Sequence, residues 1–475
     1  MRTTTLSFIG AAGTVTGSQH LLTIDAHTPS PRHILIDCGM YQGSKELRRL
    51  NWADFPIPPA QISDILLTHA HMDHTGLLPR LVKHGFQGTI WCTEATAELT
   101  EIVLRDSAHL QERDAEFAQT QGYSKHRRPE PLYRVSDVEQ TLPLLRVIDF
   151  DTPLDLGDGV IAQWVRAGHI LGSASIHVTT EEGTILFSGD LGRHTHPVLR
   201  AREIPPGADV VLIESTYGDR EHFEPDAAEH EALADAIRRT VKRGGSVLIP
   251  AFAVDRTELV LQVLAQMQDE GRIPSLPVYV DSPMALASLR IYQASRHRGE
   301  LREDVEGLSL SQLDLREVRD AQDSERLNRP HQPCIIISAS GMATGGRVLH
   351  HLEHMLPDER HTVVLTGYQA LGTRGRSLAD GARQLKMHGA YVAVRAEVVR
   401  DEEFSVHADA SELMDWVRAL DPPPQQVFCV HGEVDSATAL TELLAADGFM
   451  GIVPERGERV RVRSGKVRKR GDRLE

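Results

Sequence analysis

The chain has 475 residues, more than one simple hydrophobic core usually holds, so two domains are expected. Hydrophobic residues make up 41% and charged residues 25%, as in an ordinary globular protein. No apolar run approaches the roughly 20 residues that span a bilayer, so no membrane contact is expected. The net charge of −16 argues against a protein that coats itself with nucleic acid. Four widely spaced cysteines indicate buried thiols and a cytoplasmic location.

The first 217 residues alternate short apolar strands with loops. After a hairpin at 6–9 and 20–24, strands are predicted at 33–37, 62–68, 89–92, 160–165, 175–179, 184–188 and 210–213. Helices are predicted near 75–85 and 94–119. This order indicates two sheets covered by helices rather than a regular strand–helix alternation.

From residue 218 the pattern changes to strand–helix units. Helices are predicted at 227–242, 256–269 and 346–355, between strands at 246–252, 277–280, 334–338 and 362–366. Such units predict a parallel sheet that is buried on both faces. The charged region 300–332 has a weak pattern and is expected to hold helix and loop.

Short strands then return at 391–399, 427–430, 451–453 and 459–463, around helices near 409–420 and 436–446. The sequence therefore predicts an α/β domain at 218–390, inserted into a domain formed by 1–217 and 391–475. The C-terminal end of that domain, 459–470, is strongly basic, and it is either a solvated tail or a contact for nucleic acid or another partner.

Three imidazoles and a carboxylate stand within six residues, at His69, His71, Asp73 and His74. A buried strand precedes them and a helix follows, so they lie on a strand-to-helix turn. There, His69 and His71 can face one metal while Asp73 and His74 face a second metal beside it. Imidazole nitrogen and carboxylate oxygen are ligands that zinc prefers. The alternative, a solvated histidine-rich loop, does not account for the full pattern after a buried strand.

Three further candidates follow strands and stand next to glycines. Asp37 follows the apolar run 33–36, His169 lies between Gly168 and Gly172, and Asp190 ends the run 184–189. Each alone would more often be a turn aspartate or a hydrogen-bonded core histidine. Together with the first cluster they indicate further ligands of a metal centre with two ions.

In this order the candidates resemble the metallo-β-lactamase fold of binuclear hydrolases. Three later motifs, which contain Glu214, His407 and His431, resemble those of the β-CASP nucleases, as does the run 337–342. The resemblance covers nearly the whole chain. It implies an α/β fold, namely a metallo-β-lactamase αββα sandwich with an inserted parallel α/β (β-CASP) domain.

The resemblance also implies which residues hold two divalent ions per chain, Zn²⁺ in the first place and Mn²⁺ as the alternative. One ion would be held by His69, His71 and His169, the other by Asp73, His74 and His431, with Asp190 between them. Asp37 would orient a ligand histidine and fix its tautomer. Asp73 and Asp37 would thus contribute to catalysis together with Glu214 and His407.

By the same resemblance the reaction is hydrolysis of RNA phosphodiester bonds to 5′-phosphate and 3′-hydroxyl products. His407, held by Glu214, is the expected general acid for the leaving 3′ oxygen. The alternatives are that Glu214 caps a strand end and that His407 begins a helix. Ser338, Ser340 and Gly341 follow a strand and precede a helix, so they are either phosphate-binding residues or a plain turn.

The chain looks like the bacterial relatives of the endonuclease subunit that processes the 3′ ends of eukaryotic mRNA. Histidine at position 431 goes with the RNA-directed branch of the family, whereas the DNA-repair branch usually has valine. The motif at 404–408 lacks the extra glycine typical of ribonuclease J, which favours endonuclease over 5′-exonuclease action. Single-stranded RNA is the expected partner; the oligomeric state is open, with a homodimer as one option.

Two other functions fit the metallo-β-lactamase fold. One is a hydrolase of small thioesters, lactones or β-lactams, but such an enzyme needs no inserted domain. The other is an inactive RNA-binding scaffold, but every ligand position is intact. Local basic residues such as Arg374 and Arg376 would reconcile RNA binding with an acidic chain.

Overall fold

The computed structural model describes residues 3–121, 129–222, 229–303, 305 and 310–464. The chain divides into two compact units, one of residues 1–42, 46–221 and 406–475 and one of residues 43–45 and 222–405. The basic residues after 464 lie outside the described part. Within that part, no helix has both the length and the apolar character that crossing a membrane requires.

The first unit contains two seven-stranded mixed sheets. The first sheet has the order β22 (Arg459–Arg461), β1 (Thr5–Phe8), β2 (His20–Ile24), β3 (Arg32–Ile36), β4 (Ile62–Leu66), β5 (Thr89–Cys92) and β6 (Leu145–Val147). The second sheet has the order β21 (Gly451–Ile452), β20 (Gln426–Val430), β11 (Val210–Glu214), β10 (Gly183–Phe187), β9 (Ala174–Thr180), β8 (Val160–Arg166) and β7 (Leu154–Gly157).

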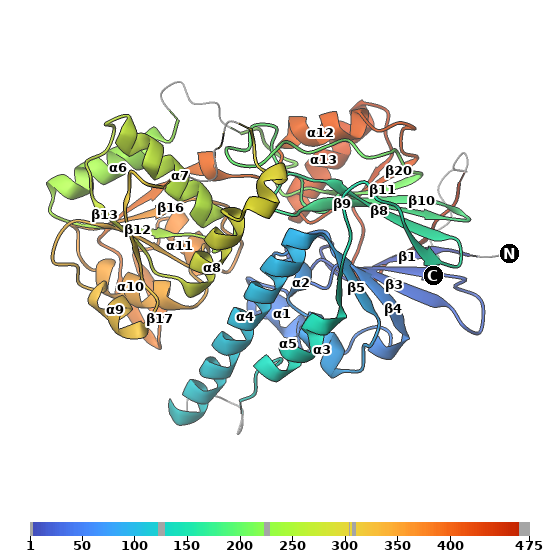
Figure 1. Cartoon of the computed structure of the whole chain (residues 1–475), viewed down its shortest axis with the longest axis horizontal. Coiled ribbons are helices and arrows are strands. Elements are labelled where there is room, and N and C mark those ends of the chain that lie inside the picture. Colours follow the sequence, from blue (N-terminus) through green and yellow to red (C-terminus); the bar gives the residue numbers. More distant parts are fainter. Residues whose placement is uncertain (1–2, 122–128, 223–228, 304, 306–309, 465–475) are drawn as a thin grey trace. The chain divides into compact units, whose positions relative to one another are not determined.

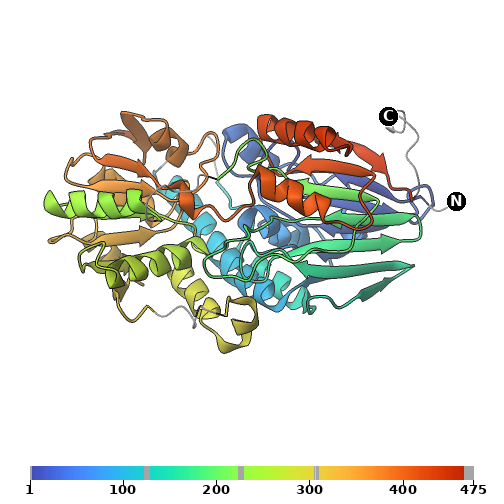
Figure 2. The ribbon, with the colours of Figure 1, turned by 90° about the horizontal axis from the view of Figure 1, so that it is seen from above.

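Helices cover the outer face of each sheet, which completes an αββα sandwich (Figure 1). The first sheet is covered by α2 (Met72–Thr75), α3 (Leu78–Lys83), α4 (Glu94–Gln121) and α5 (Val135–Thr141), with α1 (Lys45–Leu50) and the short turns η1 (Pro59–Gln61) and η2 (Leu142–Leu144) nearby in the chain. The second sheet is covered by α12 (Ala410–Arg418) and α13 (Val434–Ala446), which lie across its strands in Figure 2. The expected sandwich is confirmed.

The apolar strands bury both of their faces, which explains why they appear in the sequence as continuous hydrophobic runs. In β11, Val210 and Leu212 belong to the core between the sheets, whereas Val211 and Ile213 pack against α12 and α13. Large side chains such as Trp164 fill the inter-sheet core and are fully buried. Fully burying a valine, leucine, isoleucine or phenylalanine side chain contributes about 1.5–3 kcal/mol.

Parallel pairing brings the carboxyl ends of several strands to one edge. In the first sheet β3, β4 and β5 are parallel, and in the second sheet β10, β11 and β20 are parallel. The candidates of the sequence follow these strands: Asp37 after β3, the histidine cluster after β4, Asp190 after β10, Glu214 at the end of β11 and His431 after β20.

The second unit contains a six-stranded parallel sheet with helices on both faces. The parallel sheet is as predicted, but its edge strand at 314–317 lies in the region 300–332, where only helix and loop were expected. Its order is β14 (Asp314–Glu317), β13 (Pro277–Val280), β15 (Ile335–Ser338), β12 (Val247–Pro250), β16 (Thr362–Leu365) and β19 (Glu397–Arg400). Its helices are α6 (Glu231–Lys242), α7 (Arg256–Asp269), α8 (Pro283–Tyr292), α9 (Ala321–Arg326), α10 (Arg347–Met355) and α11 (Arg374–Ala379), with the 3₁₀ turns η3 (Ser295–Glu300) and η4 (Glu402–Phe404). In Figure 1, α6 and α7 lie on one side of this sheet and α10 on the other.

The single strand predicted at 391–399 is wrong, because two strands of different sheets occupy this segment. β18 (Ala390–Ala393) pairs with β17 (Gln384–Met387) in a hairpin, and β19 joins the large sheet. Between them, the N–H groups of Arg395 and Ala396 both donate to the Leu356 carbonyl, which ends the hairpin and redirects the chain. Because β19 pairs with β16, the second unit continues to Ser405, beyond the predicted domain end at residue 390.

Candidate metal centre

The histidine cluster lies on the predicted turn between β4 and a helix. His71 stands in an extended conformation directly before α2, and the buried His69 and His74 lie on either side of it in the chain. The neighbouring loop fixes the turn, since the Cys38 N–H donates to the His74 carbonyl over 2.7 Å. Gly39 allows this approach, because a Cβ there would lie 1.5 Å from the Asp73 carbonyl oxygen.

One group of donor atoms consists of His69, His71, His169 and Asp190, whose ligand atoms all lie within 4.8 Å of one another. The His71 Nδ1 is 3.1 Å from the His69 Nε2 and 3.3 Å from the His169 Nε2. The Asp190 Oδ2 is 3.5 Å from the His69 Nε2 and 3.7 Å from the His169 Nε2.

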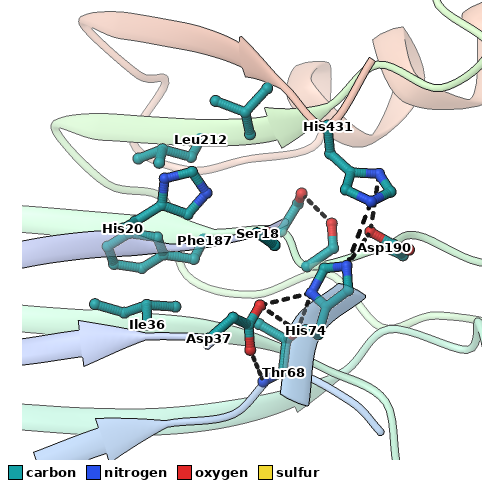
Figure 3. A pocket seen from close by; sticks show the side chains of 13 residues that line it. Ser18, His20, Ile36, Asp37, Thr68, His74, Phe187, Asp190, Leu212 and His431 are labelled. Carbon is teal, nitrogen blue, oxygen red and sulfur yellow. Dashed lines mark hydrogen bonds and ion pairs between the residues drawn. The ribbon is translucent and has the colours of Figure 1, made fainter. Parts of the chain in front are cut away.

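A second group consists of Asp73, His74 and His431. The His431 Nε2 is 3.4 Å from both the His74 Nε2 and the Asp73 Oδ2. The other oxygen of Asp190, Oδ1, lies 3.4 Å from the His74 Nε2. Asp190 therefore presents one carboxylate oxygen to each group, as Figure 3 shows for His74 and His431.

These spacings fit two metal ions better than they fit a hydrogen-bonded core. Donor atoms about 2.0–2.1 Å from a tetrahedral zinc lie about 3.3–3.4 Å from one another. The observed separations of 3.1–3.7 Å surround this value. The Asp190 Oδ1 is buried and accepts no hydrogen bond from the described residues, an arrangement that is costly unless a cation compensates it.

Asp37 and Thr68 hold His74 from behind (Figure 3). The Asp37 carboxylate accepts hydrogen bonds from the His74 Nδ1 at 2.7 Å and from the Thr68 N–H and hydroxyl at 2.8 Å each. With one proton held on Nδ1 toward Asp37, a neutral His74 presents its Nε2 as an electron-pair donor on the side of Asp190.

Burial and the nearby charges shift the pKa values in opposite directions. Burial, reinforced by neighbouring imidazoles, lowers the pKa of His69 and of His169 well below the usual range, so both are neutral. Burial also disfavours the cationic form of His74, but Asp190 and Asp37 outweigh it and raise the pKa to about 10. Burial raises the pKa of Asp190. A divalent ion thus meets two neutral imidazoles and would displace a proton from His74.

Glu214 and His407 form a pair beside the ligand groups. The Nδ1 of His407 is 3.1 Å from both carboxylate oxygens of Glu214, whose side chain is fully buried. The Leu191 N–H also donates to Glu214, over 2.6 Å. Burial raises the pKa of Glu214, but His407 outweighs burial, and the pKa falls below its usual value. The His407 ring lies 4.4 Å from the His169 ring, centroid to centroid.

A small cavity of about 20 Å³ lies against the inner side of the centre, with room for one water molecule. It is lined by Asp37, His74, Asp190, His431 and their neighbours (Figure 3). His20 also lines it, and burial lowers the pKa of that imidazole to about 3, so His20 stays neutral.

The three predicted phosphate-binding residues lie in the second unit. The buried Ser338 donates its hydroxyl to the Asp281 carbonyl over 3.2 Å, so this hydroxyl serves the fold. The Ser340 hydroxyl lies 2.9 Å from that of Thr344, and Gly341 packs against Phe252 without room for a Cβ. Among the basic residues named with them, Arg374 donates to the backbone carbonyls of 344 and 386, and Arg376 pairs with Asp380.

Sequence reasoning missed two hydroxyl residues that support the centre. The Thr68 hydroxyl contacts Asp37 and also lies 3.1 Å from the His69 Nδ1. The Thr216 hydroxyl lies 3.3 Å from the His431 Nδ1 and donates to the His431 carbonyl. Thr68 directly precedes the histidine cluster, and Thr216 lies in the motif that contains Glu214. The signal available in the sequence was therefore that each threonine stands beside candidate site residues.

Comparison with known proteins gives a consistent result. Residues 31–251 match the metallo-beta-lactamase superfamily, residues 257–378 the Beta-Casp domain, and residues 391–454 the Zn-dependent metallo-hydrolase RNA specificity domain. The chain is 38% identical to ribonuclease TTHA0252 of Thermus thermophilus over 92% of its own length and 95% of that protein. It is 32% identical to transcription termination factor FttA of Methanosarcina mazei, over 88% of this chain and 66% of that longer protein.

A solved structure of a protein of unknown function from Enterococcus faecalis V583 has the same fold. It superposes with a TM-score of 0.52 over 97% of this chain and 100% of that chain, at 14% sequence identity.

Proposed function

Because the chain belongs to the β-CASP family of metallo-β-lactamase-fold proteins, we propose that it is a metal-dependent ribonuclease. The observation that carries this proposal is the arrangement around Asp190, which faces two donor groups, next to the paired Glu214 and His407. Further support comes from the match to an RNA specificity domain and from the 38% identity to a ribonuclease.

In this proposal each donor group holds one ion. His69, His71 and His169 would hold the first ion, and Asp73, His74 and His431 would hold the second, with Asp190 contributing to both groups. The donor set of imidazole nitrogens and carboxylate oxygens suits Zn²⁺ first, and Mn²⁺ as well. When bound, such a pair lowers the pKa of water and neutralises phosphoryl oxygens.

The residues of the chain supply the proton that the leaving group needs. A water molecule loses one proton to solvent and its oxygen joins phosphorus as the bond to the 3′ oxygen breaks. The 3′ oxygen takes a proton from the Nε2 of His407, which then regains one from solvent. Glu214 holds the opposite nitrogen, Nδ1, and thereby orients the ring. The products are a 5′-phosphate and a 3′-hydroxyl. Asp37 and Thr68 act as positioning residues for His74.

In the second unit, contact with a phosphate of the RNA strand is proposed for Ser340 and Gly341, close to the amino end of α10. The hydroxyl of Ser338 does not take part, because it is buried and bound to Asp281. We further propose an endonucleolytic mode, since the motif around His407 lacks the extra glycine of ribonuclease J. The four cysteines are free and buried, which supports a cytoplasmic location.

The test uses single-stranded RNA labelled at its 5′ end, with added zinc or manganese. Internal fragments with 3′-hydroxyl ends, formed by the wild type and absent with Asp73→Ala, are the expected result. Asp54→Ala, which removes an exposed carboxylate of the same unit, is the matched control and should cleave normally. Release of a labelled mononucleotide would replace the endonucleolytic mode by a 5′-exonucleolytic one. Equal products from wild type and Asp73→Ala would remove RNA hydrolysis at this centre.

A further inference from the structure

A second kind of donor cluster lies on the surface of the second unit, in a different unit from the metal centre. It consists of His350 and Glu353 on α10 and His388 in the turn between β17 and β18. Their ligand atoms all lie within 4.8 Å of one another. The His388 Nδ1 is 2.9 Å from a Glu353 carboxylate oxygen, and the His350 and His388 rings stack at 4.6 Å between centroids.

The donor set is typical of zinc and related ions. Two imidazoles and one carboxylate, with a further position open to water, form a known type of zinc coordination. Tetrahedral coordination needs donor atoms about 3.3–3.4 Å apart, so the 2.9 Å contact must open slightly and the longer separations must close. The side chains of His388 and Glu353 are one third exposed, so small rotations about their side-chain bonds can do this.

His388 lies in a tight turn with a left-handed backbone. His388 and Gly389 form a two-residue hairpin turn with φ angles of 45° and 86°. Such turns favour Asn–Gly, because both residues adopt left-handed conformations. Histidine is less favourable than asparagine in such a turn, but here it places an imidazole beside α10.

The cluster joins two elements that already share a core. Leu385, Met387 and Val392 of the hairpin pack in one hydrophobic cluster with Leu352 and Met355 of α10. A two-stranded hairpin by itself is only marginally stable in water. An ion held by both elements would add to their docking, since a ligand that binds only the folded form stabilises it.

We propose that His350, Glu353 and His388 form a separate binding site for a first-row divalent ion, Zn²⁺ in the first place, which clamps the β17–β18 hairpin to α10. His354, the next histidine of α10, is not part of this set, because its Nδ1 donates to the His350 carbonyl over 2.8 Å. The site is independent of the RNA chemistry proposed above.

The test counts zinc ions in the full chain at a fixed free zinc concentration, by elemental analysis after removal of unbound metal. His388→Asn removes the imidazole but keeps a residue that the left-handed turn accepts. The expected result is one ion fewer than in the wild type, with unchanged cleavage of RNA. Glu353→Gln should also lose this ion, and His331→Ala, an exposed histidine of the same unit, should keep it.

Anomalous scattering at the zinc edge then locates the ion, with a peak expected between His350 and His388. Equal zinc counts in the wild type and in His388→Asn would overturn the proposal. A peak elsewhere in the second unit, or one that persists in His388→Asn, would overturn it as well.

Discussion

At the scale of single residues, Asp190 determines how the centre is organised. Its two oxygens face different donor groups, at 3.5 Å from the His69 Nε2 and 3.4 Å from the His74 Nε2. A carboxylate in this position ties the two groups together, so a change at Asp190 affects both. His407 differs, since its Nδ1 is engaged with Glu214 rather than directed at Asp190.

This difference yields a prediction for His407→Ala. The variant should lose about 10²–10⁴-fold in kcat, the range that a general acid contributes, while its metal content stays that of the wild type. Steady-state cleavage of labelled RNA and elemental analysis measure the two quantities on the same preparation. Glu214→Gln should show a similar loss, because the ring is no longer oriented by a carboxylate.

The control is His84→Ala, which removes an exposed histidine of the first unit and should leave both quantities unchanged. A large loss of bound metal in His407→Ala would make His407 a ligand instead.

How well residues could be predicted depends on where their partners lie in the chain. His69, His71, Asp73 and His74 form a contiguous pattern, so the sequence alone indicates a metal site. Glu214 and His407 are 193 positions apart, and only the family resemblance paired them before their contact was seen. The burial of Ser338 was not predictable, because the serine follows an apolar strand in the same way as an exposed turn residue would.

At the scale of elements, prediction succeeds where hydrophobic periodicity has one interpretation. Helix α7 and strand β13 have the predicted bounds, 256–269 and 277–280. It fails at 391–399, where one segment, mostly apolar but with Arg395 and Glu397 in it, contains parts of two sheets. The chain leaves one sheet for the other where it forms hydrogen bonds to the Leu356 carbonyl. Because Leu356 lies about 40 positions earlier in the chain, local hydrophobic periodicity does not indicate this partner.

Several elements of the second unit are tied together by one buried carboxylate, Asp281, at the end of β13. It accepts hydrogen bonds of 2.6 Å each from Arg347 and His351 of α10 and from Ser324 of α9. Asp281→Asn should therefore destabilise the second unit by about 3–5 kcal/mol, as when one partner of a buried ion pair is removed. The midpoint of urea unfolding measures the loss. Asp314→Asn, in the exposed pair with Arg316 of neighbouring β14, is the matched control and should leave the midpoint almost unchanged, because water and salt screen an exposed pair.

The difference in unfolding free energy between the wild type and Asp281→Asn should also depend on pH. Burial raises the pKa of Asp281, but the hydrogen bonds from His351 and Ser324 outweigh it and lower the pKa below the usual value. A carboxyl group with a depressed pKa stabilises the fold above its unfolded pKa of about 3.9, and this contribution is lost as the pH falls through the folded pKa. The difference between wild type and Asp281→Asn should thus be constant near neutral pH and shrink below about pH 4. An undiminished difference in acid would show that packing, not charge, explains it.

At the scale of the whole molecule, an acidic chain with a net charge of −16 is proposed to act on a polyanion. Binding then depends on local groups rather than on the overall field. The change of sequence pattern at residue 218 predicted a second, parallel α/β domain, and the family match and the sheet order agree with it. The later boundary was harder to place, because β18 ends and β19 begins within the short segment 391–399.

The metal centre should also stabilise the first unit. Without ions, a cationic His74 and the buried carboxylates of Asp37 and Asp190 lie close to the partly exposed Asp73, so ions that bind only the folded form shift unfolding by mass action. At a free ion concentration of about 100 times Kd, each bound ion raises the free energy of unfolding by about 2.7 kcal/mol. For a unit of this size, this corresponds to a rise in Tm of roughly 5–10 °C.

Calorimetry before and after chelation should show a fall in Tm of this size in the wild type, and Tm should recover when zinc is returned. In Asp73→Ala the fall should be smaller, because one ion has lost a ligand. A Tm that chelation leaves unchanged in the wild type would contradict a metal centre built from these residues.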